Sequence, residues 1–394
     1  MTWLRRIALA LAVLVLPAGA ACAFLLGTPM EVVLPLRSML TLCALAVLVL
    51  AAAAWWLKPA KRLLPAAVGL AGAVLAMAAA TAILRAPACE DFTVDSGGTK
   101  LAGTACMPAD NTPVPVAVFV HGSGPATRSE FRFYAETLAR RGIAAVTYDK
   151  RGAGRSGGDT YEGGYDLYAQ DLAAVSAWAA VQSFARPDTL GLVGFSEAEW
   201  VMPLAAPAVD PAYIAVVGAS ALSPHDQVSE EIEIRLGRAG YDDTAVRAAV
   251  AVNDALADYL RGALSPEDFG SVLAEAQRQP WFDVAQDLPD KVYPREAYAW
   301  WASVMETSPG AWSGYAGPVL FIKGSADDRS DADRALKRFR DLRPAHGDML
   351  DARIIEGADH MILLWPRGER TPPPAFPAGY PDLIADWILE VSQR

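Results

Sequence analysis

A short stretch at residues 192–200 places one serine where a buried strand meets a helix. An apolar run at residues 189–193 leads into it, and a helix-like pattern follows at once. A serine on such a strand-to-helix turn is a nucleophile elbow, whose crowding requires small residues two before and two after the serine. Gly194 and Ala198 meet this requirement. We therefore predict that Ser196 is a nucleophile; the alternative is a serine in an ordinary turn.

A serine hydroxyl becomes a good nucleophile only beside a base, which a carboxylate in turn orients. Of the four histidines, His360 directly follows the last predicted strand, where its side chain can face the elbow. His121 ends an earlier strand and is expected to be structural. His225 opens a long insertion, and His346 lies in a turn. We predict His360 as the base; the alternative is a surface histidine held by other partners.

The orienting carboxylate is expected after a strand that lies between the serine and the histidine in the chain. The apolar run at residues 319–322 is followed by two candidates, Asp327 and Asp328. We favour Asp327 as the acid and keep Asp328 as the second candidate. Either residue could instead cap a helix or belong to a turn.

Acyl transfer also needs two backbone N–H groups aimed at the negative charge that develops on the carbonyl oxygen. One donor is expected from the residue after the nucleophile, which is Glu197, and the other from the loop after the first parallel strand. Gly122 and Gly124 let that loop turn tightly. The N–H of Ser123 is therefore the predicted second donor; the alternative is a glycine-rich turn without a ligand.

The elements that must position these residues alternate between strands and helices. Buried strands are predicted at residues 116–120, 143–148, 189–194, 213–217, 319–322 and 353–355, and amphipathic helices at 130–141, 168–183 and 382–391. This alternation predicts an α/β fold with a mostly parallel sheet and helices on both faces. An antiparallel hairpin of residues 92–94 and 100–107 is expected to precede it.

Residues 222–317 interrupt the strand series with mostly helical periodicity. An insertion of this length inside a compact domain is usually a functional lid, so we predict a helical cap. Its aromatic side chains either line an apolar pocket for an acyl or aromatic group or pack in a core. They are Trp281, Phe282, Tyr298, Trp300, Trp301 and Trp312.

Three uncharged apolar stretches, at about residues 7–28, 38–57 and 63–84, come first in the chain. Each has roughly the 20 residues needed to cross a bilayer core, so residues 1–86 are predicted to be a membrane module with three transmembrane helices. The alternatives are a cleaved signal peptide for the first stretch and buried helices of a soluble fold. The flanking Lys and Arg residues predict a multi-pass protein of the plasma (inner) membrane, with residues 87–394 on the periplasmic or extracellular side.

Cysteine usage and charge agree with such an outside domain. Cys89 and Cys106 flank the predicted hairpin, and we predict a disulfide between them; the alternative is two free thiols. Of 34 Lys and Arg and 45 Asp and Glu, 7 and 2 lie up to Glu90, which leaves 27 against 43 beyond it. An acidic domain of this kind excludes nucleic acid as a partner, and the lipid bilayer is expected to contact the spans. No Cys/His spacing indicates a metal site, and no cofactor is expected.

Five motifs follow one another in the order typical of a known superfamily. They are His121-Gly122-Ser123-Gly124-Pro125, Tyr148-Asp149-Lys150-Arg151-Gly152-Ala153-Gly154-Arg155-Ser156, Gly194-Phe195-Ser196-Glu197-Ala198, Gly324-Ser325-Ala326-Asp327 and Gly357-Ala358-Asp359-His360. With them the chain from about residue 90 onward resembles the α/β-hydrolase fold superfamily, and it looks most like bacterial esterase and serine-aminopeptidase-like members. The resemblance implies Ser196 as nucleophile, Asp327 as acid and His360 as base.

The resemblance also bears on residues around the triad. It implies that Asp149 and Arg151 support the active-site face. Two departures from the family pattern stand out: Ala198 replaces the usual glycine, and the valine and proline that often follow the acid are missing.

We expect a membrane-anchored serine hydrolase that cleaves a small carboxylic ester through a Ser-His-Asp triad and an acyl-enzyme intermediate. An amide or peptide is the second expected substrate, because the same machinery serves both. The rival hypothesis is a catalytically silent α/β-hydrolase domain that binds a ligand. No protein partner is indicated.

Overall fold

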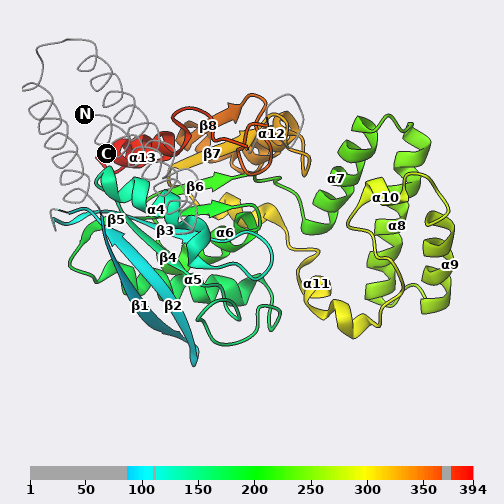
Figure 1. Ribbon diagram of the computed structural model, residues 1–394, viewed down its shortest axis with the longest axis horizontal. Helices are drawn as coiled ribbons and strands as arrows, with labels where there is room; N and C mark the ends of the chain where they lie inside the picture. The colour runs from blue at the N-terminus through cyan, green and yellow to red at the C-terminus, as the bar shows by residue number, and fades with distance from the viewer. Residues whose placement is uncertain (1–86, 110–111, 366–373, 394) are drawn as a thin grey trace, which may run out of the picture. The chain divides into compact units, whose positions relative to one another are not determined.

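The computed structural model describes residues 87–109, 112–365 and 374–393, and Pro87–Arg394 form one compact unit (Figure 1). The three predicted membrane spans lie outside the described residues and stay predictions. In the described part of the chain, no helix combines the length and the apolar character that crossing a membrane requires.

One eight-stranded sheet organises the described residues, in the order β1-β2-β4-β3-β5-β6-β7-β8. Its strands are β1 (Ala88–Ser96), β2 (Thr99–Met107), β3 (Val114–Val120), β4 (Ala144–Tyr148), β5 (Ala185–Phe195), β6 (Ile214–Val217), β7 (Val319–Gly324) and β8 (Leu350–Ile355). The β1–β2 and β2–β4 pairs are antiparallel and the remaining pairs are parallel. The predicted mostly parallel sheet is therefore confirmed.

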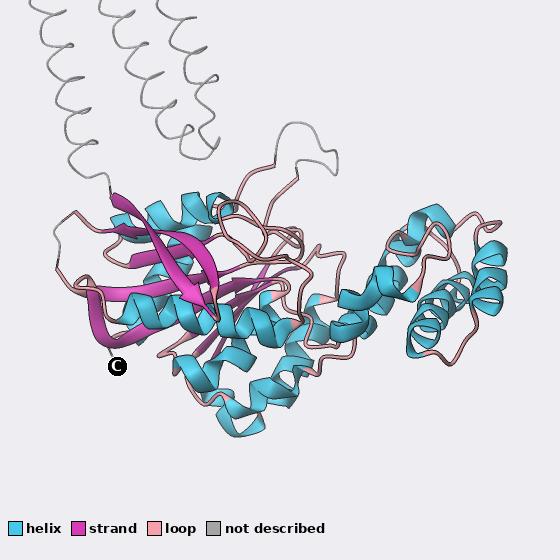
Figure 2. Ribbon diagram, turned by 90° about the horizontal axis from the view of Figure 1, so that it is seen from below, coloured by secondary structure: helices cyan, strands magenta, loops and turns pink. Residues whose placement is uncertain are grey.

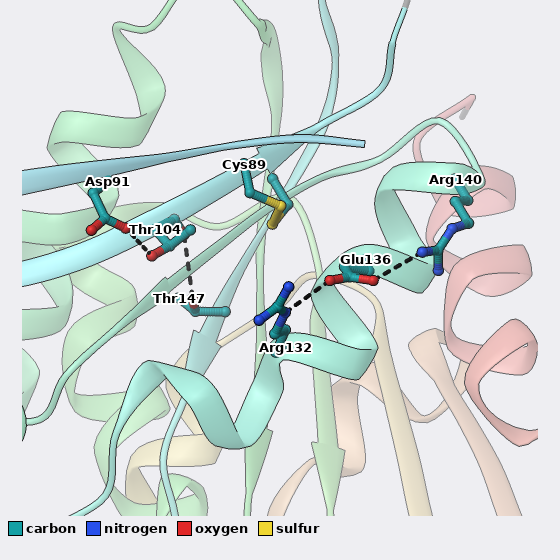
Figure 3. Close-up of a disulfide and its surroundings, with 8 residues drawn as sticks. Cys89, Asp91, Thr104, Arg132, Glu136, Arg140 and Thr147 are labelled. Atoms are coloured by element: carbon teal, nitrogen blue, oxygen red, sulfur yellow. Dashed lines mark hydrogen bonds and ion pairs between the residues drawn. A yellow bond between two sulfur atoms is a disulfide. The ribbon is translucent and has the colours of Figure 1, made fainter. Parts of the chain in front are cut away.

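The hairpin at the edge of the sheet contains the predicted disulfide. Cys89 faces Cys106 in the register of β1 and β2, and their sulfur atoms are bonded (Figure 3). Beside it the Thr104 hydroxyl donates to the Asp91 carboxylate at 2.7 Å. The prediction of a Cys89–Cys106 disulfide is confirmed, and the bond links the edge strand β1 covalently to its neighbour β2.

Helices cover both faces of the sheet (Figure 2). On one face lie α5 (Tyr165–Ala180), α6 (Ala198–Val209) and α12 (Ala332–Leu342); on the other lie α4 (Arg132–Arg140), which follows the 3-10 turn η1 (Arg128–Phe131), and α13 (Tyr380–Val391). The alternation along β3 shows why both faces need cover: Val116 and Val118 pack on the first face, and Ala117 and Phe119 on the second. The sequence patterns did not predict α12, although its Phe339 is fully buried.

Helices and 3-10 turns fill the segment between β6 and β7. They are α7 (Pro224–Arg238), α8 (Asp243–Arg261), α9 (Pro266–Ala276), α10 (Phe282–Ala285), η2 (Arg295–Tyr298), α11 (Ala299–Val304) and η3 (Pro309–Gly314). Figure 1 shows α7 to α10 as a separate group of helices to one side of the sheet, which the chain enters after β6. Leu236 of α7, Val252 of α8 and Leu273 of α9 pack with Trp281, so these helices have a core of their own.

The aromatic side chains of this insertion are divided among separate clusters. Trp281 and Phe282 belong to the core of the insertion, and Tyr298 packs in a small cluster with Tyr259. Trp312 is fully buried in the core on one face of the sheet, and Trp300 and Trp301 pack against that same core. These side chains therefore stabilise packing, and they do not line one common pocket.

Candidate active site

Ser196 occupies the sharp turn between β5 and α6. Its φ of 53° lies in the left-handed region, a strained conformation for a non-glycine residue, and its N–H donates to the Val217 carbonyl at 2.8 Å. A Cβ at Gly194 would lie 2.5 Å from the Ala198 Cβ and 2.6 Å from the Met202 sulfur. A side chain at Gly194 would thus collide with Ala198 and Met202, which explains why small residues are needed on both sides of the serine.

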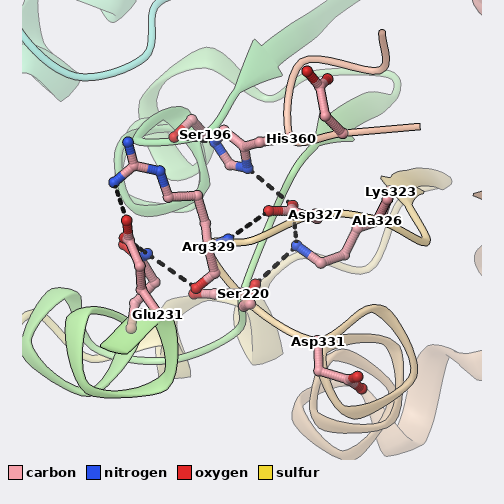
Figure 4. A network of polar contacts seen from close by, with 12 residues as sticks. Ser196, Ser220, Glu231, Lys323, Ala326, Asp327, Arg329, Asp331 and His360 are labelled. Atoms are coloured by element: carbon pink, nitrogen blue, oxygen red, sulfur yellow. Dashed lines mark hydrogen bonds and ion pairs between the residues drawn. The ribbon is translucent and has the colours of Figure 1, made fainter. Parts of the chain in front are cut away.

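His360 lies between Ser196 and Asp327 (Figure 4). Its Nε2 is 2.9 Å from the Ser196 Oγ, and its Nδ1 is 2.9 Å from the Asp327 Oδ2. Asp328, the second candidate, points elsewhere, because its carboxylate pairs with Arg235 of α7 at 3.4 Å. The structure therefore brings together the nucleophile, base and favoured acid of the sequence analysis and leaves Asp328 outside.

Two glycines allow the loops that carry the acid and the base to approach. A Cβ at Gly324, which ends β7, would lie 2.1 Å from the Ala358 carbonyl oxygen in the histidine loop. A Cβ at Gly218, which follows β6 with a φ of 78°, would lie 3.0 Å from the His360 Cε1. Larger residues at either position would displace the imidazole.

Lys323 is a site residue that the sequence analysis missed. Its fully buried ammonium donates to the Asp327 Oδ2 at 2.7 Å and to the Ser330 hydroxyl at 2.8 Å. Burial alone would raise the pKa of Asp327, but His360 and Lys323 outweigh it and hold that pKa well below its usual range. The available signal was a lysine directly after the apolar run at residues 319–322, four residues before the aspartate.

The insertion contacts the acid loop through two arginines. The Arg329 N–H donates to the Asp327 Oδ1 at 2.7 Å, and its guanidinium pairs with Glu231 of α7 at 2.6 Å. Arg238 of α7 donates to the Asp327 carbonyl at 2.9 Å. Burial, followed by the charge of Asp287, raises the pKa of Glu231 to about 7. Helix α7 and the triad acid are thus joined by polar contacts.

The two predicted oxyanion donors lie on segments that touch. A Cβ at Gly122 would be 3.5 Å from the Ser196 Cβ, so the loop at residues 121–125 packs directly on the elbow. Gly124 has a φ of 83°, which permits the tight turn. Neither the Ser123 N–H nor the Glu197 N–H makes a hydrogen bond within the described residues. Their role as donors stays a prediction.

Glu199 and Trp200, which follow Ala198, hydrogen-bond to the loop that follows β6. The buried Glu199 carboxylate accepts from the N–H groups of Ser220 at 3.0 Å and Ala221 at 2.9 Å. The Trp200 indole donates to the Leu222 carbonyl at 2.9 Å. Both side chains are therefore held by the loop at residues 220–222.

The remaining residues that the sequence analysis named lie around the site. Asp149 accepts from the N–H of Arg128 at 2.9 Å, and Arg151 forms a bidentate pair with Asp171 at 2.6 and 3.0 Å, as expected of supports. Burial, followed by the charge of Lys150, lowers the pKa of His121 to about 3, so His121 is neutral.

The other two histidines lie away from the triad. His225 lies 3.1 Å from an Asp254 carboxylate oxygen in the insertion, and His346 lies in the 3-10 turn η4 (Pro344–Met349). In the described segments, no group of His, Cys, Asp and Glu could hold a metal ion.

Comparison with known proteins identifies relatives. Residues 97–362, more than half of the chain, match the family model described as X-Pro dipeptidyl-peptidase (S15 family). No curated protein matches. The ferulic acid complex of Est1E from Butyrivibrio proteoclasticus is 16% identical, with 77% of this chain and 98% of that chain covered and a TM-score of 0.47. An esterase of Pyrococcus furiosus is 14% identical, with 78% and 91% covered and a TM-score of 0.48.

Proposed function

Because the chain belongs to the X-Pro dipeptidyl-peptidase (S15) family and has the α/β-hydrolase fold, we propose that it is a serine hydrolase that uses Ser196, His360 and Asp327 as its triad. The observation that carries the proposal is the continuous relay from the Ser196 Oγ through the imidazole to the Asp327 carboxylate, with both contacts at 2.9 Å. A silent binding domain would not need this arrangement.

The mechanism follows from the relay. The Ser196 Oγ attacks a carbonyl carbon while the His360 Nε2 takes its proton, and Asp327 holds the Nδ1–H of the resulting imidazolium. The N–H groups of Ser123 and Glu197 stabilise the oxyanion. The imidazolium then protonates the leaving group, and a water molecule, deprotonated by the same histidine, releases the acyl group from Ser196.

We propose a carboxylic ester as the first substrate class. A dipeptidyl-peptidase must also bind a free α-amino group, for which a carboxylate is the natural partner. Near the triad, the Glu231 carboxylate pairs with Arg235 and Arg329, and the Asp327 carboxylate pairs with Lys323. Because arginine or lysine already neutralises these two carboxylates, neither offers a partner for a substrate amino group, and an ester needs none. The family description favours a second candidate, a peptide with proline in its second position.

A fluorophosphonate probe tests the serine hydrolase proposal. The wild-type protein should be labelled, Ser196→Ala should not, and Ser271→Ala on the exposed surface of α9 should be labelled like the wild type. Absence of wild-type labelling would favour the silent binder. Rates with p-nitrophenyl butyrate and with an Xaa-Pro p-nitroanilide then decide between the two substrate classes.

The proposal includes membrane anchoring, with the hydrolase domain outside the cytoplasm. The apolar stretches of residues 1–86 and the Cys89–Cys106 disulfide, which requires an oxidising compartment, support it. The test is protease added to the medium of membrane vesicles, which digests only a domain that faces the medium. In vesicles whose medium side is the periplasmic side, digestion supports the proposal and protection contradicts it.

A further inference from the structure

Lys150 is a buried cation that belongs neither to the triad nor to the apolar core of the sheet. It follows β4 with 5% of its surface exposed, and its ammonium stands 4.4 Å from the centre of the Tyr168 ring. The ammonium donates to the Gly122 carbonyl at 3.2 Å and forms an ion pair with the Glu197 carboxylate. Its two hydrogen-bond partners therefore belong to the two segments that carry the predicted oxyanion donors.

The first contact determines the direction of one donor. The Gly122 carbonyl and the Ser123 N–H belong to the same planar trans peptide unit, so they point in opposite directions. An ammonium held on the carbonyl side therefore orients the N–H away from Lys150. It also polarises the peptide and makes the N–H a stronger donor.

This contact matters because the loop packs on the elbow but has few hydrogen bonds that fix the direction of its peptide units. Within the described residues, no other hydrogen bond holds the main chain at residues 122–124. Gly122 and Gly124 flank the donor, and glycine lacks the Cβ that would restrict rotation of the peptide unit. Without Lys150 the Ser123 N–H would therefore sample several directions.

The second contact is with the side chain of Glu197, the residue whose N–H is the other predicted donor. The Glu197 side chain is 1% exposed, and among the described residues Lys150 is its hydrogen-bond partner. Burial raises the pKa of Glu197, and the nearby ammonium opposes this effect. One ammonium thus connects the backbone of the loop with the residue that follows the nucleophile.

We propose that Lys150 is a positioning residue that holds the N–H of Ser123 in the direction required to stabilise the oxyanion, while its ion pair with the Glu197 side chain ties that loop to the residue after the nucleophile. The inference rests on the proposed serine hydrolase function. In this role Lys150 acts through the Gly122–Ser123 peptide and does not touch the substrate.

The test separates positioning from plain stabilisation with two variants. Lys150→Met alone would leave the Glu197 carboxylate buried without a partner and could prevent folding. The double variant Lys150→Met/Glu197→Gln removes both charges together, whereas Glu197→Gln alone keeps the amine on the Gly122 carbonyl. Arg343→Met serves as the control, because Arg343 is a buried cation that donates to the backbone carbonyls of Tyr315 and Gly317.

The readout is the second-order rate constant of fluorophosphonate labelling, measured on variants shown to be folded by circular dichroism and thermal unfolding. In this reaction the Ser196 Oγ–P bond forms, the P–F bond breaks with loss of fluoride, and His360 takes the proton. Loss of one oxyanion donor costs about 10²- to 10³-fold in rate. We expect the double variant to label about 10²-fold more slowly than Glu197→Gln, and Arg343→Met to label at the wild-type rate.

The outcomes are distinguishable. If the folded double variant labels as fast as Glu197→Gln, Lys150 is only a structural ion and the inference is wrong. If Arg343→Met slows labelling equally, loss of any buried cation explains the effect, and the inference is again wrong. If the wild type itself is not labelled, the proposed function fails first. With p-nitrophenyl butyrate, the positioning role predicts a fall in kcat with little change in KM.

Discussion

Replacement of Lys323 by methionine should move the pH dependence of catalysis. Methionine keeps an unbranched buried side chain but removes the charge. The Lys323 ammonium and the His360 Nδ1 contact the same Asp327 oxygen at 2.7 and 2.9 Å, so they are no more than 5.6 Å apart, the sum of these two distances. The ammonium therefore opposes protonation of the imidazole, which must be neutral to accept the proton from Ser196.

The magnitude follows from Coulomb's law. Two unit charges 5.6 Å apart interact by about 3 kcal/mol at an effective dielectric constant of about 20. One pH unit corresponds to about 1.36 kcal/mol, so the acid limb of kcat/KM should move by about 2 units. Its direction is toward higher pH, because loss of a positive charge favours the protonated imidazole. The Asp327 carboxylate remains in contact with the imidazole and acts in the same direction.

The assay is the pH profile of p-nitrophenyl ester hydrolysis between pH 4 and 9, or of fluorophosphonate labelling if no ester is cleaved. Lys337→Met on α12 is the matched control, since Lys337 is exposed and pairs with Asp341. A folded Lys323→Met protein whose acid limb coincides with that of the wild type would refute the electrostatic argument. A shift of the same size in Lys337→Met would do so as well.

Three further results are expected. Asp327→Asn should lower kcat by about 10⁴-fold through the wrong imidazole tautomer, whereas Asp328→Asn should stay close to wild type; equal losses in the two variants would contradict the acid assignment. Replacing Cys89 and Cys106 together by alanine should lower the free energy of unfolding by about 3 kcal/mol without changing kcat, as measured by urea unfolding and ester hydrolysis, and an unchanged unfolding midpoint would argue against it. Because the pKa of Glu231 is raised from 4.5 to about 7, the folded protein retains a proton in this window that the unfolded chain has lost. The free energy of unfolding should therefore fall by up to about 3 kcal/mol as pH rises from 4.5 to 7, and the fall should be smaller in Glu231→Gln. Urea unfolding of both proteins at both pH values measures the fall, and an equal fall in the two proteins would contradict the prediction.

Much of the fold is readable from local sequence patterns. The apolar runs of β3, β4 and β7 are buried on both faces, which is why each appears as a continuous hydrophobic stretch. In contrast, α12 was not predicted because its exposed face is highly charged and few apolar residues mark its buried face. The boundaries moved by a few residues, since helix and strand ends depend on tertiary hydrogen bonds.

The sequence by itself determined the nucleophile elbow and the order of the motifs, because a strand-to-helix turn and its small neighbours are local requirements at Gly194 and Ala198. It also narrowed the acid to two adjacent aspartates. Only the tertiary structure decided between them and revealed Lys150 and Lys323 beside the site. The reason is physical: a lysine's role depends on which distant carbonyl or carboxylate the folded loops bring within hydrogen-bond distance, and spacing along the chain does not encode that distance.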